Sequence, residues 1–301
     1  MITSLKTASS SSAKSDWPAK VDLFGIGVSC VTIDAACEAI LRAARLREST
    51  AVSAFSVHAL IEVVSDARLA DKVNNFAMIT PDGQPVRWAL NWLYSAGLRS
   101  NVRGSDLFWK VCEQASYDGV PIYLYGGTGE TLALLRAKLV DSFPGIQIVG
   151  AESPPFRPLT PQEDAEMVAR VNDSKAGIVC LGLGSPKQDQ FAAAHVGRIH
   201  AVQLCIGAAF DFMAGTKATA PLWMQGYGLE WVFRLWQEPG RLWKRYLVTN
   251  TTFVALLLMQ LIRRRHRENV HDSERGQLAF EPHQPSLANR RSNLTDRRRQ
   301  L

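Results

Sequence analysis

Residues 176–184 read AGIVCLGLG, a short apolar run that ends in glycines and is followed by a helical pattern. Residues 120–127, VPIYLYGG, have the same form and precede helical spacing from Glu130 to Phe143. A short apolar run without polar alternation is typical of a strand that is buried on both faces. These two segments therefore predict parallel strands with helices packed on either side.

The alternation of strand and helix continues on both sides of these segments. Ile33–Arg47 has apolar residues at helical spacing, and Thr160 with Glu163 has the form of a capping box that opens a helix to about Asn172. We expect an α/β fold, namely a mostly parallel, Rossmann-like sheet with helices on both faces, plus a C-terminal helical appendage. The other expected strands lie at 21–31 (a strand or a hairpin), at the start of 51–60, and at 76–83, 146–152 and 201–208.

Composition divides the chain into four expected parts. Residues 1–20 are Ser-rich without an apolar core, which favours a disordered leader over a signal peptide. Residues 21–220 are expected to form an α/β domain. Residues 221–262 are expected to form a helical appendage, and 263–301 a basic disordered tail.

The surplus of positive charge lies mostly in that tail. Of the 34 basic and 28 acidic residues, ten arginines and five acids lie in 263–301, which leaves the preceding body nearly neutral. A neutral body lacks the basic face of a nucleic-acid groove, so we expect no nucleic-acid partner. The five cysteines are scattered without a C-x-x-C pair, which is typical of buried thiols in a reducing cytosol.

The segment Val248–Ile262 is apolar in its second half and is followed at once by RRRHR. Fifteen helical residues reach roughly 22 Å, which is short of a hydrocarbon layer about 30 Å thick. This length favours a helix that lies at an anionic membrane surface, anchored by apolar side chains and tail arginines. A helix packed on the body or on a partner subunit is the alternative.

Ligands of such sheets bind beyond the carboxyl ends of the strands, so the loops there are the first places to look for chemistry. Gly126 and Gly127 follow an expected strand and precede a helix. Glycines let backbone N–H groups approach phosphate oxygens, and a helix N-terminus adds positive partial charge. A tight turn explains the same residues, because the loop is neither a G-x-G-x-x-G nor a Walker sequence.

The loop from Ser185 to Gln188 has the same placement. Ser185 with Gln188 three residues later has the spacing of a second capping box. Lys187 in the first helical turn opposes the helix dipole, and a bound phosphate or carboxylate would offset that.

Asp82 follows the expected strand at 76–81. It lies where a general base should lie, although Asp-Gly is also a common turn sequence.

Residues 222–246, LWMQGYGLEWVFRLWQEPGRLWKRY, combine tryptophans with a cluster of cations. Two helices that meet at Pro239-Gly240 would account for the tryptophans. The cations suit the diphosphate of a nucleotide or of a lipid pyrophosphate. The sequence has no Asp-x-Asp pair and no His or Cys cluster at ligand spacing, so we predict neither a metal site nor a cofactor. The cations are Arg234, Arg241, Lys244 and Arg245.

At these residues the chain resembles the WecG/TagA/CpsF family of glycosyltransferases, from about Phe24 to Tyr246. The shared segments are TPDGQPVRWA, VRGSDLF, LGLGSPKQDQF, GAAFDFMAG and APLWMQGYGLEWVFRLWQEPGRLWKRY. The resemblance implies an inverting, metal-independent enzyme that moves a sugar from a UDP-sugar to an undecaprenyl-pyrophosphate-linked acceptor. It also implies a membrane-docking C-terminal segment.

The resemblance assigns roles to particular residues. Asp82 matches the catalytic base, and Gln188 matches a glutamine near the sugar nucleotide. Arg234, Arg241 and Lys244 match cationic positions of the family that close over the diphosphate. At the position of Lys244 the family usually has arginine. The full set expected to bind substrate is Ser53, Ser56, Arg103, Gly126, Gly127, Lys187, Gln188, Arg234, Arg241, Lys244 and Arg245.

Two positions depart from the family pattern. The usual Thr-x-Asn reads Ala54-Phe55-Ser56, and Ser53 or Ser56 is a candidate replacement. The usual arginine three residues before the glycine of G-x-D-L is Asn101, with Arg99 or Arg103 as candidate substitutes. These departures indicate either a different donor sugar or reduced activity.

The resemblance thus implies a glycosyltransferase of cell-surface or exopolysaccharide synthesis, peripheral on the inner face of the bacterial cytoplasmic membrane. Its expected partners are a UDP-sugar, a polyprenyl-pyrophosphate-linked acceptor and an anionic membrane surface. Which sugar is transferred stays open, as does the oligomeric state, a homo-oligomer included. The alternatives are a nucleotide-cofactor oxidoreductase, based on Gly126–Gly129, and a membrane-associated scaffold whose site has decayed.

Overall fold

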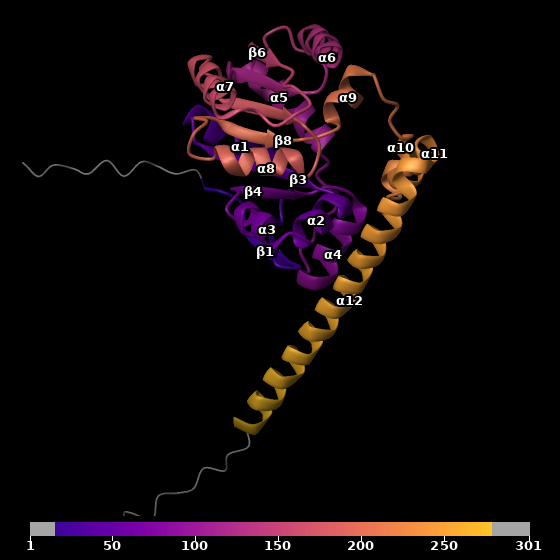
Figure 1. Cartoon of the computed structure of the whole chain (residues 1–301). Helices are drawn as coiled ribbons and strands as arrows, with labels where there is room; N and C mark the ends of the chain where they lie inside the picture. Colours follow the sequence, from indigo (N-terminus) through magenta and orange to yellow (C-terminus); the bar gives the residue numbers. More distant parts are fainter. Residues whose placement is uncertain (1–15, 279–301) are drawn as a thin grey trace, which may run out of the picture. The chain divides into compact units, whose positions relative to one another are not determined.

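A computed structural model describes residues 16–278, apart from the side chains of Leu222, Arg241 and residues 267–278. The chain divides into two units, Met1–Leu258 and Met259–Leu301. The sheet, the candidate site and the start of the last helix belong to the first unit (Figure 1). Residues 1–15 of the predicted leader and 279–301 of the predicted tail lie outside the described range.

A six-stranded parallel sheet forms the centre of the first unit, as predicted. Its order is β4-β3-β8-β7-β5-β6, and each neighbouring pair runs parallel. The segment at 21–31 forms a separate antiparallel hairpin, β1 (Lys20–Leu23) with β2 (Ile26–Ser29). The strands of the sheet are β3 (Thr50–Phe55), β4 (Met78–Pro81), β5 (Ile122–Gly126), β6 (Ile148–Glu152), β7 (Ile178–Gly182) and β8 (Val202–Cys205).

Helices cover both faces of this sheet, because successive residues of each buried strand point to opposite sides. Even-numbered strand residues such as Val52 and Leu204 join one apolar cluster. Odd-numbered residues face α8 instead, and the Tyr125 ring stacks on Phe191 at 5.0 Å. The first face is covered by α1 (Ile33–Arg45), α5 (Gly104–Asp118), α6 (Gly129–Ser142) and α9 (Ala209–Ala214), and the second by α2 (Val57–Val64), α3 (Ala67–Asn74), α7 (Pro161–Asp173) and α8 (Lys187–His195).

The fold has a topological switch point between the neighbouring strands β5 and β7. The helix after β5, α6, lies on one face, and the helix after β7, α8, lies on the other. Such a reversal opens a crevice at the carboxyl ends of the two strands, which is where open α/β sheets bind ligands. The predicted loops at Gly126 and Gly182 both lie at this edge.

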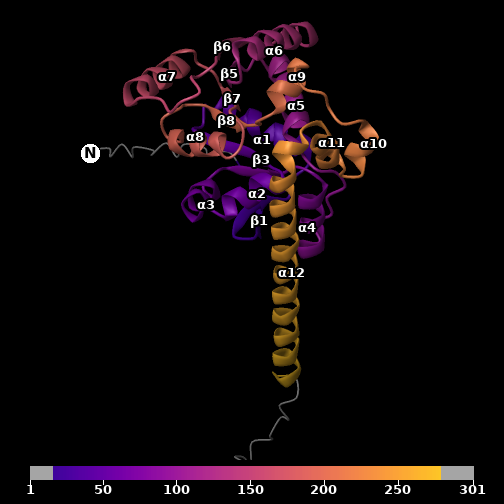
Figure 2. The same ribbon diagram turned by 45° about the vertical axis from the view of Figure 1, so that its right-hand side comes forward.

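Three further helices follow α9. They are α10 (Leu222–Gly226), α11 (Glu230–Gln237) and α12 (Pro239–Leu278). The predicted break at Pro239-Gly240 is confirmed, since α11 ends and α12 begins there, whereas the short α10 was not expected. Residues 263–278, placed in the disordered tail from their charge, continue α12 as helix. The remaining helix, α4 (Gln84–Tyr94), directly follows β4 and lies near α12 in both views (Figures 1 and 2).

Candidate active site

Asp82 is fixed at the carboxyl edge of the sheet by the backbone around it. Its N–H donates to the Phe55 carbonyl at 3.0 Å, which extends the β3–β4 ladder by one residue. Gly83 then adopts φ 89°, a conformation that disfavours residues with a Cβ, and turns the chain into α4. The side chain of Asp82 therefore projects from the end of β4, as predicted for a general base.

The surroundings of Asp82 raise its pKa to about 6. Burial is the main cause, because removal from water disfavours the charged carboxylate, and the negative charge of Glu230 adds to it. The positive charges of Arg234 and Arg103 and the Gly104 N–H, which donates to the carboxyl, act in the opposite direction. A carboxyl with this pKa is mostly ionised at neutral pH yet holds a proton more strongly than an exposed aspartate.

The Gly104 N–H reaches Asp82 because the start of α5 lies close to the sheet. A Cβ at Gly104 would lie 3.3 Å from the Ala54 Cβ and 3.5 Å from the Ile206 carbonyl oxygen. Gly104 is also the first residue of α5, so Asp82 faces the positive end of that helix. The small side chain at Ala54, one of the departures from the family pattern, lines this close approach.

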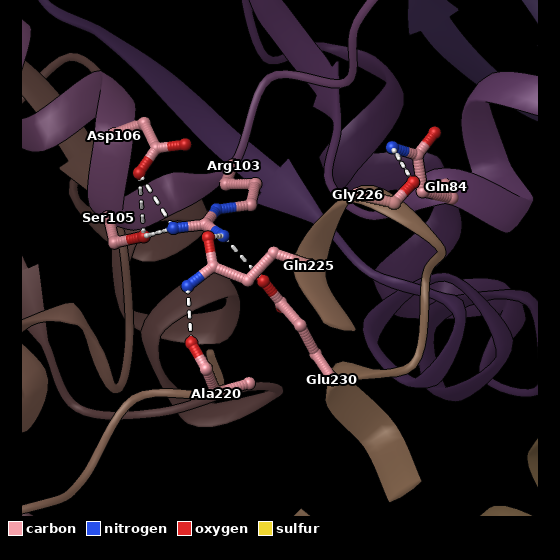
Figure 3. Close-up of polar contacts among 8 residues, drawn as sticks. All are labelled: Gln84, Arg103, Ser105, Asp106, Ala220, Gln225, Gly226 and Glu230. Carbon is pink, nitrogen blue, oxygen red and sulfur yellow. Dashed lines mark hydrogen bonds and ion pairs between the residues drawn. The ribbon is translucent and has the colours of Figure 1, made fainter. Parts of the chain in front are cut away.

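Arg103 ties this part of the body to α10 and α11 (Figure 3). Its Nη1 donates to Glu230 Oε1 at 2.5 Å and to the Gln225 side-chain oxygen, and its Nη2 donates to Asp106 Oδ1 at 2.8 Å. Gln225 in turn donates to the Ala220 carbonyl at 2.6 Å. Both Nη atoms of Arg103 are used in these contacts, while its buried Nε has no partner within the described residues. Its binding of substrate stays a prediction.

Two further contacts join the appendage to the body. Gln84 Nε2 donates to the Gly226 carbonyl at 3.3 Å, next to the start of α4 (Figure 3). The Arg234 guanidinium lies 4.8 Å from the centre of the Phe212 ring in α9. This cation–π contact holds a predicted diphosphate-binding arginine near Asp82.

The remaining predicted cations lie at the start of α12. Lys244 Nζ lies 5.4 Å from the Trp243 ring, and both side chains are exposed. Arg245 is also exposed and acts electrostatically on His58, whose pKa falls to about 4, mainly through burial. The backbone of Arg241 belongs to α12, and its side chain lies outside the described atoms.

The predicted serines have partners within the body. Ser53 is fully buried and donates to Asp189 Oδ1 at 2.6 Å. Ser185 donates to Asp189 Oδ2 at 2.8 Å, so its predicted role in a capping box is wrong. The N-cap of α8 is Pro186, whose side chain has no group that could cap the helix. Ser56 caps α2, where its hydroxyl accepts from the Ala59 N–H.

Gln188 lies at the middle of the sheet edge. It is only 3% exposed, and its Oε1 is buried without a hydrogen-bond partner in the part of the chain that is described. A Cβ at Gly207, just after β8, would lie 3.3 Å from that oxygen. The neighbouring Lys187 is exposed at the start of α8.

Gly126 and Gly127 lie further along the same edge. A Cβ at Gly126, whose φ is 125°, would come within 2.6 Å of the Gly182 backbone. The Gly127 N–H donates to the Gly182 carbonyl at 3.2 Å, and Thr128 caps α6. Strands are about 4.8 Å apart, so the ends of β4 and β5 lie roughly 19 Å apart across the sheet. The site is therefore long, with Asp82 at one end and the glycines near the other.

Sequence reasoning missed Glu230, Gln225 and Phe212. Each acts through a partner far away in the chain, and no local pattern marked them. Phe212 lies within the GAAFDFMAG segment that carried the family resemblance, which was the one available signal. Among the described side chains, which end at His266, no group of three or more His, Cys, Asp or Glu is arranged to hold a metal ion.

Most of the chain matches a known family. Residues 21–267 match the Glycosyl transferase WecG/TagA/CpsF family, a range that includes the whole sheet, Asp82 and the helices α10 and α11. This family comprises membrane-associated cytoplasmic enzymes. The chain therefore belongs to the WecG/TagA/CpsF family, and it is a glycosyltransferase of cell-surface polysaccharide synthesis that takes a nucleotide-sugar donor and a lipid-linked acceptor.

Proposed function

We propose that the enzyme transfers a sugar from a UDP-sugar to an undecaprenyl-pyrophosphate-linked glycan in exopolysaccharide synthesis, with inversion and without a metal. The observation that carries this proposal is the Asp82 carboxyl. It is largely removed from water, has a pKa raised to about 6, and lies among Arg103, Arg234 and the N-terminus of α5. Family membership leaves the oxidoreductase alternative without support.

The reaction is a single displacement. Asp82 takes the proton from an acceptor hydroxyl, and the hydroxyl oxygen forms a bond to the anomeric carbon of the donor. The bond from that carbon to the diphosphate oxygen breaks on the opposite face, so the configuration inverts and UDP leaves. General-base assistance of this kind contributes roughly 10²–10⁴-fold to the rate.

Cations of the appendage are proposed to stabilise the leaving diphosphate. Arg234 is already held near Asp82 over Phe212, and Arg241, Lys244 and Arg245 follow at the start of α12. Positive charge placed where the leaving group becomes more negative lowers the barrier without requiring a metal ion.

Donor binding is proposed to run along the sheet edge. Gln188 has an unpartnered buried oxygen that suits a hydroxyl or N–H donor of the sugar nucleotide. Lys187, Ser56 and the backbone at Gly126 and Gly127 lie along the same edge. Ser53 acts indirectly in this scheme, through the Asp189 carboxylate that also holds Ser185.

The appendage is proposed to attach the enzyme peripherally to the cytoplasmic face of the membrane. In α12, one stripe packs on the body through Leu242, Phe253 and Leu257. A second stripe is equally apolar but exposed, which is unusual for a soluble helix. It consists of Leu247, Val254 and Leu258, with Val248 beside it. The window Leu242–His266 is long and apolar enough to cross a membrane by length and composition alone, but it includes the buried residues Leu242, Phe253 and Leu257.

A transfer assay tests the mechanism. Radiolabelled UDP-sugars are offered with a short-chain polyprenyl-pyrophosphate glycan, with and without a chelator, and the anomeric configuration of the product is read by NMR. We expect one donor to be used, an inverted product and no effect of the chelator. Retention of configuration would contradict the single displacement, and loss of activity with the chelator would contradict metal independence.

A further inference from the structure

Two tryptophans of the body lie exposed on α4. The rings of Trp88 and Trp92 stack with centroids 6.4 Å apart, and 62% of Trp92 is exposed. The opposite face of α4 is fully buried through Val86, Leu90 and Leu93. α4 is thus apolar on two faces, and the body covers only one of them.

Aromatic side chains of α10 extend this uncovered face. Trp223 and Tyr227 are one helical turn apart and are 61% and 73% exposed. Gly228, directly after Tyr227, lies against α4, where a Cβ would come within 3.6 Å of the Trp88 ring and 2.9 Å of the Gln84 Cβ. Through Gly228, α10 adjoins α4, so these four exposed aromatic residues lie on adjoining segments. Trp88, Trp92, Trp223 and Tyr227 are here called the aromatic row.

Positive charge predominates in the sequence around the aromatic row. No acidic residue lies between Gly83 and Ser105, a stretch that holds Arg87 and Arg99 as well as Arg103, which is paired with Glu230. Near α10, Lys217 is paired with Asp211 at 2.9 Å. Trp and Tyr are enriched at the headgroup layer of bilayers, and cations next to them are attracted by anionic lipids. A symmetric dimer through this row would instead bring its basic residues towards their own copies.

We propose that the aromatic row is a second membrane contact, which seats the catalytic body itself in the headgroup layer of an anionic bilayer. α4 begins at Gln84, two residues after Asp82, so this contact would set the base at the depth of a lipid-linked headgroup. The inference rests on the proposed membrane attachment of the enzyme, and it adds a contact made by the body rather than by α12.

Vesicle binding by the full-length chain tests this contact without requiring activity. Vesicles of phosphatidylcholine alone and with phosphatidylglycerol are compared for wild type, Trp92→Ser, and Trp88→Ser with Trp92→Ser. The matched control is Tyr117→Ser with Phe156→Ser, two exposed aromatic residues outside the row. We expect the partition coefficient on anionic vesicles to fall roughly tenfold in the double variant and less in Trp92→Ser, and to stay unchanged in the control. Thermal melting verifies that each variant is folded.

The outcomes separate the two proposals. Equal binding by wild type and the double variant overturns this inference and leaves the attachment through α12 standing. Wild type that fails to bind anionic vesicles overturns the membrane attachment and this inference together. A change of molar mass by light scattering, without any change in vesicle binding, assigns the row to a second copy and also overturns the inference.

Discussion

β7 and α11 are both rich in large apolar side chains, yet they differ completely in burial. Ile178, Val179 and Leu181 of β7 are at most 1% exposed, whereas none of the eight residues of α11 is buried and 80% of Trp236 is exposed. The sheet is held by burial of apolar surface. The contacts of α10 and α11 with the body include two polar pairs, Arg103 with Glu230 and Gln84 with Gly226, and the cation–π contact of Arg234 with Phe212.

This difference indicates which part of the molecule can adjust during catalysis. Apolar packing is spread over many side chains and resists opening, whereas a few partly exposed polar contacts exchange readily with water. We therefore expect the stability of the protein to depend on the packing of the body. We expect the closure of α10 and α11 over Asp82 to depend on the contacts of Arg103 and Arg234. The predictions below separate these two dependences.

The largest expected effect is on activity alone. Asp82→Asn removes the proposed base while keeping the side-chain shape, so the transfer rate should fall roughly 10²–10⁴-fold. The variant should melt no lower than wild type, because it removes a carboxyl whose burial disfavours its charge. Single-turnover transfer and thermal melting check both expectations, and undiminished transfer would remove Asp82 as base.

The contact between Arg103 and Glu230 should matter for closure more than for stability. Glu230→Gln removes one charge of the 2.5 Å ion pair and leaves the half-buried Arg103 beside Asp82. We expect kcat to fall roughly tenfold to a hundredfold, as is typical when a positioning contact is lost. Hydrogen exchange should increase in α10 and α11 but not in β7. Equal exchange in wild type and variant would contradict the role of this ion pair in closure.

A loss of stability is expected where Gly126 of β5 lies beside Gly182 of β7. Gly126→Ala would place a Cβ 2.6 Å from the Gly182 backbone at a φ of 125°, and we expect a loss of about 1–3 kcal/mol of stability. Gly129→Ala is the matched control, because a Cβ there meets nothing within 4 Å. Urea unfolding measures both variants. Equal stability of the two variants would show that the close approach of Gly126 to Gly182 tolerates a side chain.

The smallest effect is expected at Phe212. Phe212→Leu keeps an apolar side chain but removes the ring face below Arg234, a contact worth about 0.5–1 kcal/mol at an exposed site. The KM for the donor should rise a few-fold, while the melting temperature stays close to that of wild type. Initial rates at varied donor concentration measure this, and an unchanged KM would show that Arg234 needs no support from Phe212.

Local patterns were sufficient to predict the body. The short apolar runs at 120–127 and 176–184 gave the buried parallel strands, and the capping box at Thr160 and Glu163 is confirmed. Periodicity and capping act within a few residues, so a single sequence displays them. The capping box at Ser185 failed because a nearby carboxylate, Asp189, engages the hydroxyl instead.

The candidate site was predictable only in part. Asp82 was found from its place at the end of a strand, and its role as base stays a prediction. Arg103 was predicted as a ligand of substrate, yet its charge is met by Glu230, which lies 127 residues further along the chain. Pairing over such a separation leaves no local signal. The extension of α12 beyond Ile262 was missed because charge alone was read as disorder.

The pH dependence of kcat/KM in wild type and Glu230→Gln tests the central claim most directly. Asp82 acts when deprotonated, so kcat/KM should fall as the pH drops through its pKa, which is raised to about 6. Glu230 raises that pKa and Arg103 lowers it, so removing the Glu230 charge should move the acidic limb to lower pH. A limb that stays in place or moves to higher pH would contradict an Asp82 base governed by the Arg103–Glu230 contact.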